Sequence, residues 1–185
     1  MSIIIDSYSE TNRSQNATFS AVTTRLGQSF IADGTTLDSA TLMLSKIGLP
    51  TGNLDYSIYA HAGTYGSSGI PTGTPLATSN TIDVATLTTT PTLVSLGFTG
   101  INKIVLASST NYFLVATHVG ADASNAPYIG IDDTSPTHGG NVASWNTPTW
   151  SAISTWDFPF YVYSVSPPPA LTGISTLTGV SSITL

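Results

Sequence analysis

The feature that most constrains the fold of this chain is a series of short apolar runs, alternating or β-branched, separated by clusters of Gly, Pro, Asn and Ser. Such runs, spaced about ten residues apart, are typical of β-strands joined by turns. No stretch carries the 3.6-residue apolar period of a substantial helix. We predict strands at residues 28–32, 37–45, 54–61, 82–87, 93–98, 103–106, 112–119, 128–131, 142–145 and 158–165.

The segment 37–45 indicates how these strands pack. Its alternating positions form two sets, and both sets contain apolar residues, for example Met43 in one and Leu42 in the other. A strand with two partly apolar faces suits a sandwich, in which one face is inward and the other is covered by a loop or a partner. We therefore expect an all-β, jelly-roll-like antiparallel β-sandwich, with a β-barrel as the alternative. The Gly- and Pro-rich residues 62–75 are expected to form a long loop.

The chain divides into residues 1–166, the sandwich, and residues 167–185, an extended C-terminal arm. Pro167, Pro168 and Pro169 predict a stiff spacer at the start of the arm. A six-residue repeat follows, and its apolar positions, with the final residue, are Leu171, Ile174, Leu177, Val180, Ile183 and Leu185. Repeats of this kind are stable only when stacked or paired. We expect the arm to wind with copies of itself, most simply three, or to lie across a neighbouring protein; the alternative is a frayed terminus.

The composition excludes several classes of function. The 185 residues include only 4 Lys and Arg against 10 Asp and Glu, for a net charge of -6, so the chain lacks the cations that bind a phosphate backbone. No apolar run is long enough to cross a membrane. The chain has no Cys, which rules out disulfides and thiolate metal sites. We expect neither a nucleic-acid partner nor a membrane partner.

Five motifs together resemble a known domain family. They are Gly27-Gln28-Ser29-Phe30 and the segments 37–42, 44–53, 58–66 and 132–141. From about residue 27 to residue 165 the chain resembles the choice-of-anchor R type of β-sandwich domain, which occurs in bacterial surface proteins and in structural proteins of tailed phages. The resemblance implies the fold and the context, and it supplies no catalytic residues.

The resemblance also suggests where the protein resides. Surface members of the family would carry a signal peptide before the domain and an anchor after it. The sequence shows neither pattern, since its first residues have no basic region. We therefore expect a product that is made in a host cytoplasm and built into the virion surface. The alternative is an extracellular or cell-surface location.

Metal sites and cofactors are not expected. His61, His118 and His138 form no local ligand pair. Asp132 and Asp133, with His138 nearby, would suit Ca²⁺, but an Asx-type turn explains them as well. Asp6 and Glu10 are a second candidate ion site that lacks a third ligand.

The sequence does not point to an enzyme. No Gly-x-Ser-x-Gly elbow is present, and no carboxylate pair stands out among the ten acids. Four aromatic residues are candidate glycan contacts because flat rings stack on sugars: Tyr65, Trp145, Trp150 and Trp156. The alternative is that these rings belong to core or hairpin packing, with Trp150 the most exposed of the tryptophans.

These observations favour a virion structural protein, specifically a capsid decoration (cement) protein. We expect a homotrimer that docks on the major capsid protein or another virion protein through its arm. The alternative is the carbohydrate-binding head of a tail fibre or surface adhesin, with a surface glycan as its partner.

Overall fold

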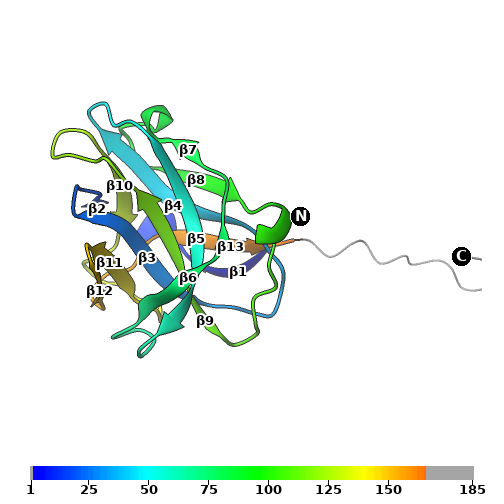
Figure 1. Cartoon of the computed structure of the whole chain (residues 1–185). Helices are drawn as coiled ribbons and strands as arrows, with labels where there is room; N and C mark the ends of the chain where they lie inside the picture. The colour runs from blue at the N-terminus through cyan, green and yellow to red at the C-terminus, as the bar shows by residue number, and fades with distance from the viewer. Residues whose placement is uncertain (1, 166–185) are drawn as a thin grey trace, which may run out of the picture.

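Two antiparallel β-sheets packed face to face make up the described part of the chain, residues 2–165 of a computed structural model (Figure 1). Sheet A contains β1 (Ile3–Tyr8), β13 (Phe160–Ser164), β4 (Leu37–Ile47), β10 (Ala126–Ile131), β2 (Gln15–Thr18) and β8 (Thr92–Gly97). Sheet B contains β12 (Thr149–Ile153), β11 (Val142–Asn146), β3 (Thr23–Ile31), β9 (Asn111–His118), β5 (Asn53–Ala62), β6 (Ile70–Thr78) and β7 (Ile82–Asp83). The expected all-β sandwich is confirmed.

Connections between the strands repeatedly cross from one sheet to the other. The chain passes from β3 in sheet B to β4 in sheet A and back to β5 in sheet B. In sheet A, β13 and β10 follow each other along one side of β4, and β8 pairs along the other side. This alternation between sheets is the connectivity of a jelly-roll-like sandwich.

Within residues 2–165, the helical segments are three short 3-10 turns: η1 (Glu10–Asn12), η2 (Val84–Thr86) and η3 (Gly100–Asn102). Among residues 2–165, no helix has the length and apolar character needed to cross a bilayer.

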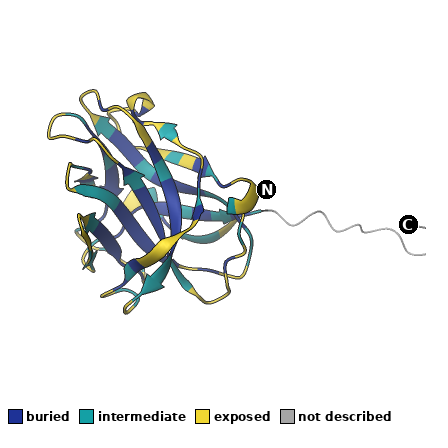
Figure 2. Cartoon of the chain, viewed as in Figure 1, coloured by how far each residue is buried: buried dark blue, intermediate teal, exposed yellow. Residues whose placement is uncertain are grey.

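The main core lies between the two sheets, where the period-two alternation of the strands directs every second side chain (Figure 2). Leu42 and Leu44 of β4 face Phe30 of β3 and Ile58 of β5 in this fully buried cluster. Tyr56 of β5 crosses the core, and its hydroxyl donates to the carbonyl of Val94 in sheet A at 2.9 Å. That bond satisfies a polar group that burial would otherwise leave unpaired.

A second, smaller cluster covers the outer face of sheet B. Tyr59, Phe113, Val115 and Ala143 are buried there, although they point away from the main core. The two edge strands of the sheet, β6 and β12, approach each other, so the sheet curls around this cluster. A buried apolar second face is therefore present in sheet B, whereas the sequence predicted it for residues 37–45, which form β4 of sheet A.

Several strand predictions were wrong. β1, β2, β6 and β12 were not predicted, and the expected strand at 103–106 is only an isolated bridge between Thr36 and Val105. Residues 70–75, the second part of the expected loop 62–75, belong to β6 (Ile70–Thr78) despite Pro71 and Pro75. Proline is tolerated there because β6 is an edge strand, where a missing N–H breaks no interior pairing.

Both ends of the described chain meet at one end of the sandwich. β1 pairs with β13, so that Ile3 lies opposite Ser164 (Figure 1). The expected arm, residues 167–185, lies outside the described residues.

Candidate functional site

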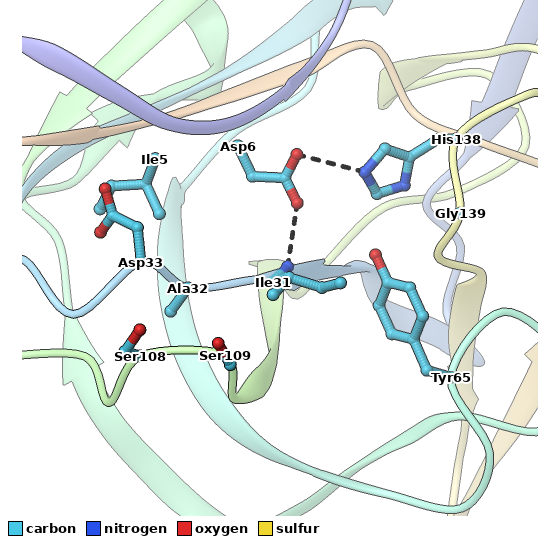
Figure 3. A pocket seen from close by; sticks show the side chains of 10 residues that line it. All are labelled: Ile5, Asp6, Ile31, Ala32, Asp33, Tyr65, Ser108, Ser109, His138 and Gly139. Carbon is cyan, nitrogen blue, oxygen red and sulfur yellow. Dashed lines mark hydrogen bonds and ion pairs between the residues drawn. The ribbon is translucent and has the colours of Figure 1, made fainter.

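An open pocket of about 640 Å³ lies where five separate segments meet (Figure 3). Its lining comes from β1, the end of β3, the β5–β6 loop, the turn before β9 and the β10–β11 loop: Ile5, Asp6, Ile31, Ala32, Asp33, Tyr65, Ser108, Ser109, His138 and Gly139. The volume lies within the range of small-molecule sites, roughly 300–1,000 Å³. The pocket is therefore the candidate functional site.

Asp6 lies at the rim of this pocket because β1 is irregular there. The pairing of β1 with β13 shifts register between Ile4 and Asp6, and such a bulge re-aims a side chain. The carboxylate accepts hydrogen bonds from the backbone N–H of Ile31 at 2.9 Å and of Ser7 at 2.8 Å. Burial opposes ionisation of Asp6, but hydrogen bonds from His138 and Ile31 outweigh it and hold the pKa of the carboxyl below its usual value.

His138 contacts Asp6 from the β10–β11 loop. Its Nδ1 accepts from the N–H of Gly140 at 3.1 Å and lies 3.2 Å from Nε2 of Gln28. The neutral ring therefore carries its proton on Nε2, which faces Asp6 Oδ1 at the long distance of 3.4 Å. The ring packs edge-on against Phe160, with centroids 5.0 Å apart, and its side chain is only 9% exposed.

A buried carboxylate supports the loop from beneath. Asp157 Oδ2 accepts from the backbone N–H of His138 at 2.9 Å, and Oδ1 accepts from Nε2 of Gln28 at 3.2 Å. Gln28 in turn accepts the N–H of Phe158 at 2.8 Å. Burial raises the pKa of Asp157 to about 6, against the opposing effect of His138. This network fixes the wall of the pocket, so the groups at its mouth are held in place before any ligand arrives.

The open side of the pocket presents hydroxyls and a free carboxylate oxygen. Figure 3 shows the hydroxyl of Tyr65 on one side of Ile31 and the hydroxyls of Ser108 and Ser109 on the other, below Ala32. None of the three side-chain hydroxyls has a hydrogen-bond partner among residues 2–165. Asp33 accepts through Oδ1 from the N–H and hydroxyl of Thr35, and its Oδ2 has no hydrogen-bond partner among residues 2–165. Burial, together with the charges of Asp6 and Asp157, raises the pKa of Tyr65, so this phenol is a neutral donor.

The four predicted glycan contacts do not form one site. Trp145 and Trp150 are cross-strand partners in the β11–β12 hairpin, with centroids 5.5 Å apart in an edge-to-face arrangement. Arg25 covers Trp145 at 5.2 Å, and Tyr59 meets Trp150 at 6.4 Å. Both rings are half-buried, and each packs against a neighbouring side chain of the hairpin or of sheet B.

The other two rings lie in separate pockets. Trp156 packs against the main core and lines a second pocket, of about 380 Å³, beside Asn16 and Ser144. Of the four aromatic candidates, Tyr65 alone lines the pocket of about 640 Å³. Its ring lies 6.0 Å from the ring of His61, measured between centroids.

The two candidate ion sites are occupied by protein hydrogen bonds. Asp132 Oδ1 accepts from the N–H groups of Thr134 and Ser135, the geometry of an Asx-type turn, and Oδ2 accepts from the hydroxyl of Tyr8. Asp6 bonds to Ile31 and Ser7, whereas Glu10 bonds to Tyr161, so these two carboxylates have different partners. Within residues 2–165, no group of three or more His, Asp or Glu side chains is arranged to hold a metal ion.

No known family model, curated protein or solved structure matches this chain.

The pocket brings together residues that the sequence did not single out as partners. The sequence offers Asp6 and His138 as candidate ion ligands in different sets, and it gives no signal for Asp33, Ser108 or Ser109. Apart from the adjacent serines, these residues lie 27 or more positions apart, and no local spacing connects them. The one signal in the sequence is the Gly-rich segment around Tyr65, which was predicted to be a long loop, because such loops are often functional.

Proposed function

We propose that this chain is a structural protein of a virus particle, a capsid decoration protein that holds a β-sandwich head on the capsid through its C-terminal segment. The observation that carries the proposal is the position of the last described residue, Val165, at the end of β13. β13 lies between β1 and β4, and the N–H of Val165 donates to the carbonyl of Thr36 at 2.9 Å. The last described residue is therefore anchored in the interior of a sheet and is a firm base for a tether.

Four exposed apolar side chains lie at the same end of the sandwich as Val165. Ile3 and Ile4 lie on β1, opposite Ser164 and Tyr163, and Val105 bridges to Thr36. Ile101, 94% exposed, lies in η3. Lys103, just after η3, and Ser2 both bond to Asp38, which brings η3 to the same end. Contiguous exposed apolar residues mark interaction surfaces, so this end is the one that would face the capsid or neighbouring copies.

The six-residue repeat and the family resemblance supply the rest of the argument. A segment that pairs its backbone with a neighbour's strands gains main-chain hydrogen bonds and apolar burial. Three such segments bound together multiply weak contacts by raising the effective concentration. The role is geometric and requires no chemistry in the sandwich.

Light scattering after size exclusion tests the proposal on the full chain and on a chain that ends at Val165. We expect a trimer for the full chain and a monomer for the shortened one.

The double variant Ile3→Ser, Ile101→Ser should weaken sedimentation with undecorated phage capsids. Leu49→Ser, an equally polar change at an exposed residue of the β4–β5 turn, should not. A full chain that stays monomeric at every concentration and does not sediment with capsids refutes the proposal.

The alternative, a carbohydrate-binding head, has one specific observation in its favour. Tyr65 lines the larger pocket together with Asp6 and His138, whereas the tryptophan pair of the β11–β12 hairpin is packed against its own neighbours. A glycan would therefore bind in the Tyr65 pocket, and not at the tryptophans.

A further inference from the structure

The pocket between Asp6, Tyr65 and Ser108 combines an apolar floor with a polar rim. Ile31 is 43% exposed at the floor, and Ile5 lies beside it. The ring of Tyr65 forms one wall, and the hydroxyl-bearing turn at Ser108 and Ser109 forms the opposite one (Figure 3). A ligand seated here would contact carbon on one face and oxygen around its edge.

The free hydrogen-bonding groups of the rim include donors as well as acceptors. The hydroxyls of Tyr65, Ser108 and Ser109 can donate or accept, whereas Oδ2 of Asp33 can only accept. The Asp6 carboxylate already accepts three hydrogen bonds and has one lone-pair position left for a ligand. This mixture matches a ligand that itself carries several groups able to donate and accept.

We infer that this pocket binds a pyranose unit of a glycan, with the C–H face of the sugar on Ile31 and the Tyr65 ring and its hydroxyls on Asp33, Asp6 and the two serines. A pyranose has an apolar face and an edge of hydroxyls, so it uses both the floor and the rim. This inference does not depend on the capsid proposal, because the pocket is formed entirely by residues 5–139.

Two other ligand classes fit the pocket less well. Ca²⁺ takes six to eight oxygen ligands, but both oxygens of Asp6 are bound to N–H groups, and no third carboxylate lines the pocket. An ammonium or guanidinium group of a protein partner would pair with the two carboxylates. Because such a group only donates hydrogen bonds, it could not accept one from the hydroxyls of Tyr65, Ser108 and Ser109. A sugar satisfies every one of these groups.

The pocket is also built before the ligand arrives. The β10–β11 loop that carries His138 and Gly139 is held by the buried bonds of Asp157 and Gln28. Asp6 is fixed by backbone N–H groups from β1 and β3. A preformed site avoids part of the entropy cost of binding. Because the pocket is open and shallow, we expect dissociation constants on the order of 1 mM for a single sugar unit.

Titration of the isotope-labelled full chain with methyl pyranosides, followed by two-dimensional NMR, tests the inference. The panel contains the methyl glycosides of glucose, galactose, mannose and N-acetylglucosamine, each raised to about 100 mM, or about 100 times the expected constant. We expect at least one to shift the amides of Ile31, Asp33, Tyr65, Ser109 and Gly139 in a saturable manner.

Three variants separate this pocket from general effects. Tyr65→Phe keeps the ring and removes the hydroxyl, and it should weaken binding about fivefold, the loss of one hydrogen bond. Asp33→Asn keeps the acceptor for Thr35 and replaces the free oxygen with a donor, so it should weaken binding by a similar factor. Asp83→Asn is the matched control, because Asp83 accepts from the N–H of Ala85 in the same kind of turn and lies outside the pocket. It should bind as the unaltered chain does.

Four results would overturn the inference. The first is no saturable shift with any glycoside, and the second is a set of shifts confined to the Trp156 pocket or the β11–β12 hairpin. The third is equal binding by Tyr65→Phe and the unaltered chain. The fourth is saturation by CaCl₂ or N-acetyl-lysine methylamide with no response to the sugars. None of these results bears on trimer formation, so the capsid proposal is tested separately.

Discussion

Burial opposes the ionisation of Asp157, and this makes the stability of the protein depend on pH. Its pKa is raised to about 6 by burial, against an ordinary value of 3.8. Between these values the folded chain binds a proton that the unfolded chain does not, so this group adds stability as the pH falls from 7 toward 4. Asp6 and Asp132, with lowered pKa values, act in the opposite direction only below about 4.

The variant Asp157→Asn isolates this contribution. We expect the unfolding free energy of the unaltered chain, relative to the variant, to rise by about 1 kcal/mol between pH 7 and pH 5. Urea unfolding at several pH values measures this difference, and comparison with the variant cancels the opposing effect of His61, whose pKa burial lowers. Asp83→Asn should leave the pH trend of the unaltered chain intact. A difference that does not change with pH contradicts the prediction.

At the scale of single elements, β1 depends on Asp6 as well as on its neighbour β13. β1 is an edge strand of sheet A, and its Asp6 carboxylate connects it to Ile31 of β3 in sheet B. Asp6→Ala removes hydrogen bonds to a charged group, each worth roughly 1.5–3 kcal/mol. We expect the amides of β1 to exchange hydrogen about tenfold faster, with those of the central strand β9 unchanged.

Hydrogen exchange followed by mass spectrometry measures this effect on peptides from β1 and β9. Asp38→Ala is the control, since Asp38 forms an exposed ion pair with Lys103, and such pairs contribute little. If β1 and β9 accelerate together in Asp6→Ala, the carboxylate supports the whole sandwich and not this strand alone.

Element by element, the sequence predicts the central strands well and the edges poorly. β5 and β9 contain several β-branched and aromatic residues, and β4 is the longest strand and carries three leucines and a methionine, so their local patterns agree with their buried place in the sheets. β6 carries two prolines and a glycine, and only its position at an edge makes it a strand. That position is a property of the sheet and is absent from the local sequence.

The candidate site could not be predicted for the same reason. Asp6 reaches the pocket through an irregularity in strand pairing, and His138 through a loop held by Asp157 from another segment. Each contribution depends on tertiary contacts between distant parts of the chain. Tyr65 was proposed as a glycan contact from its Gly-rich loop, and it does line the pocket.

For the molecule as a whole, the low charge sets the solution behaviour. With a net charge of -6 at pH 7 and an isoelectric point near 4.5, the chain loses its net charge under mildly acidic conditions. Net charge keeps proteins apart in solution. We expect a solubility minimum near pH 4.5, measured as turbidity across a pH series. Because Asp157 adds stability in the same range, the precipitate should redissolve as folded protein at pH 7; recovery of unfolded chain would contradict this.

The pairing of β1 with β13 has a mechanical consequence. The two strands are antiparallel and their outer ends lie together, so a pull between the two ends of the sandwich would peel them apart one hydrogen bond at a time. A pull through Val165 alone would load β13 along its length, where β1 on one side and β4 on the other share the force. A head tethered by its C-terminal segment would therefore resist tearing far better than one held by both ends.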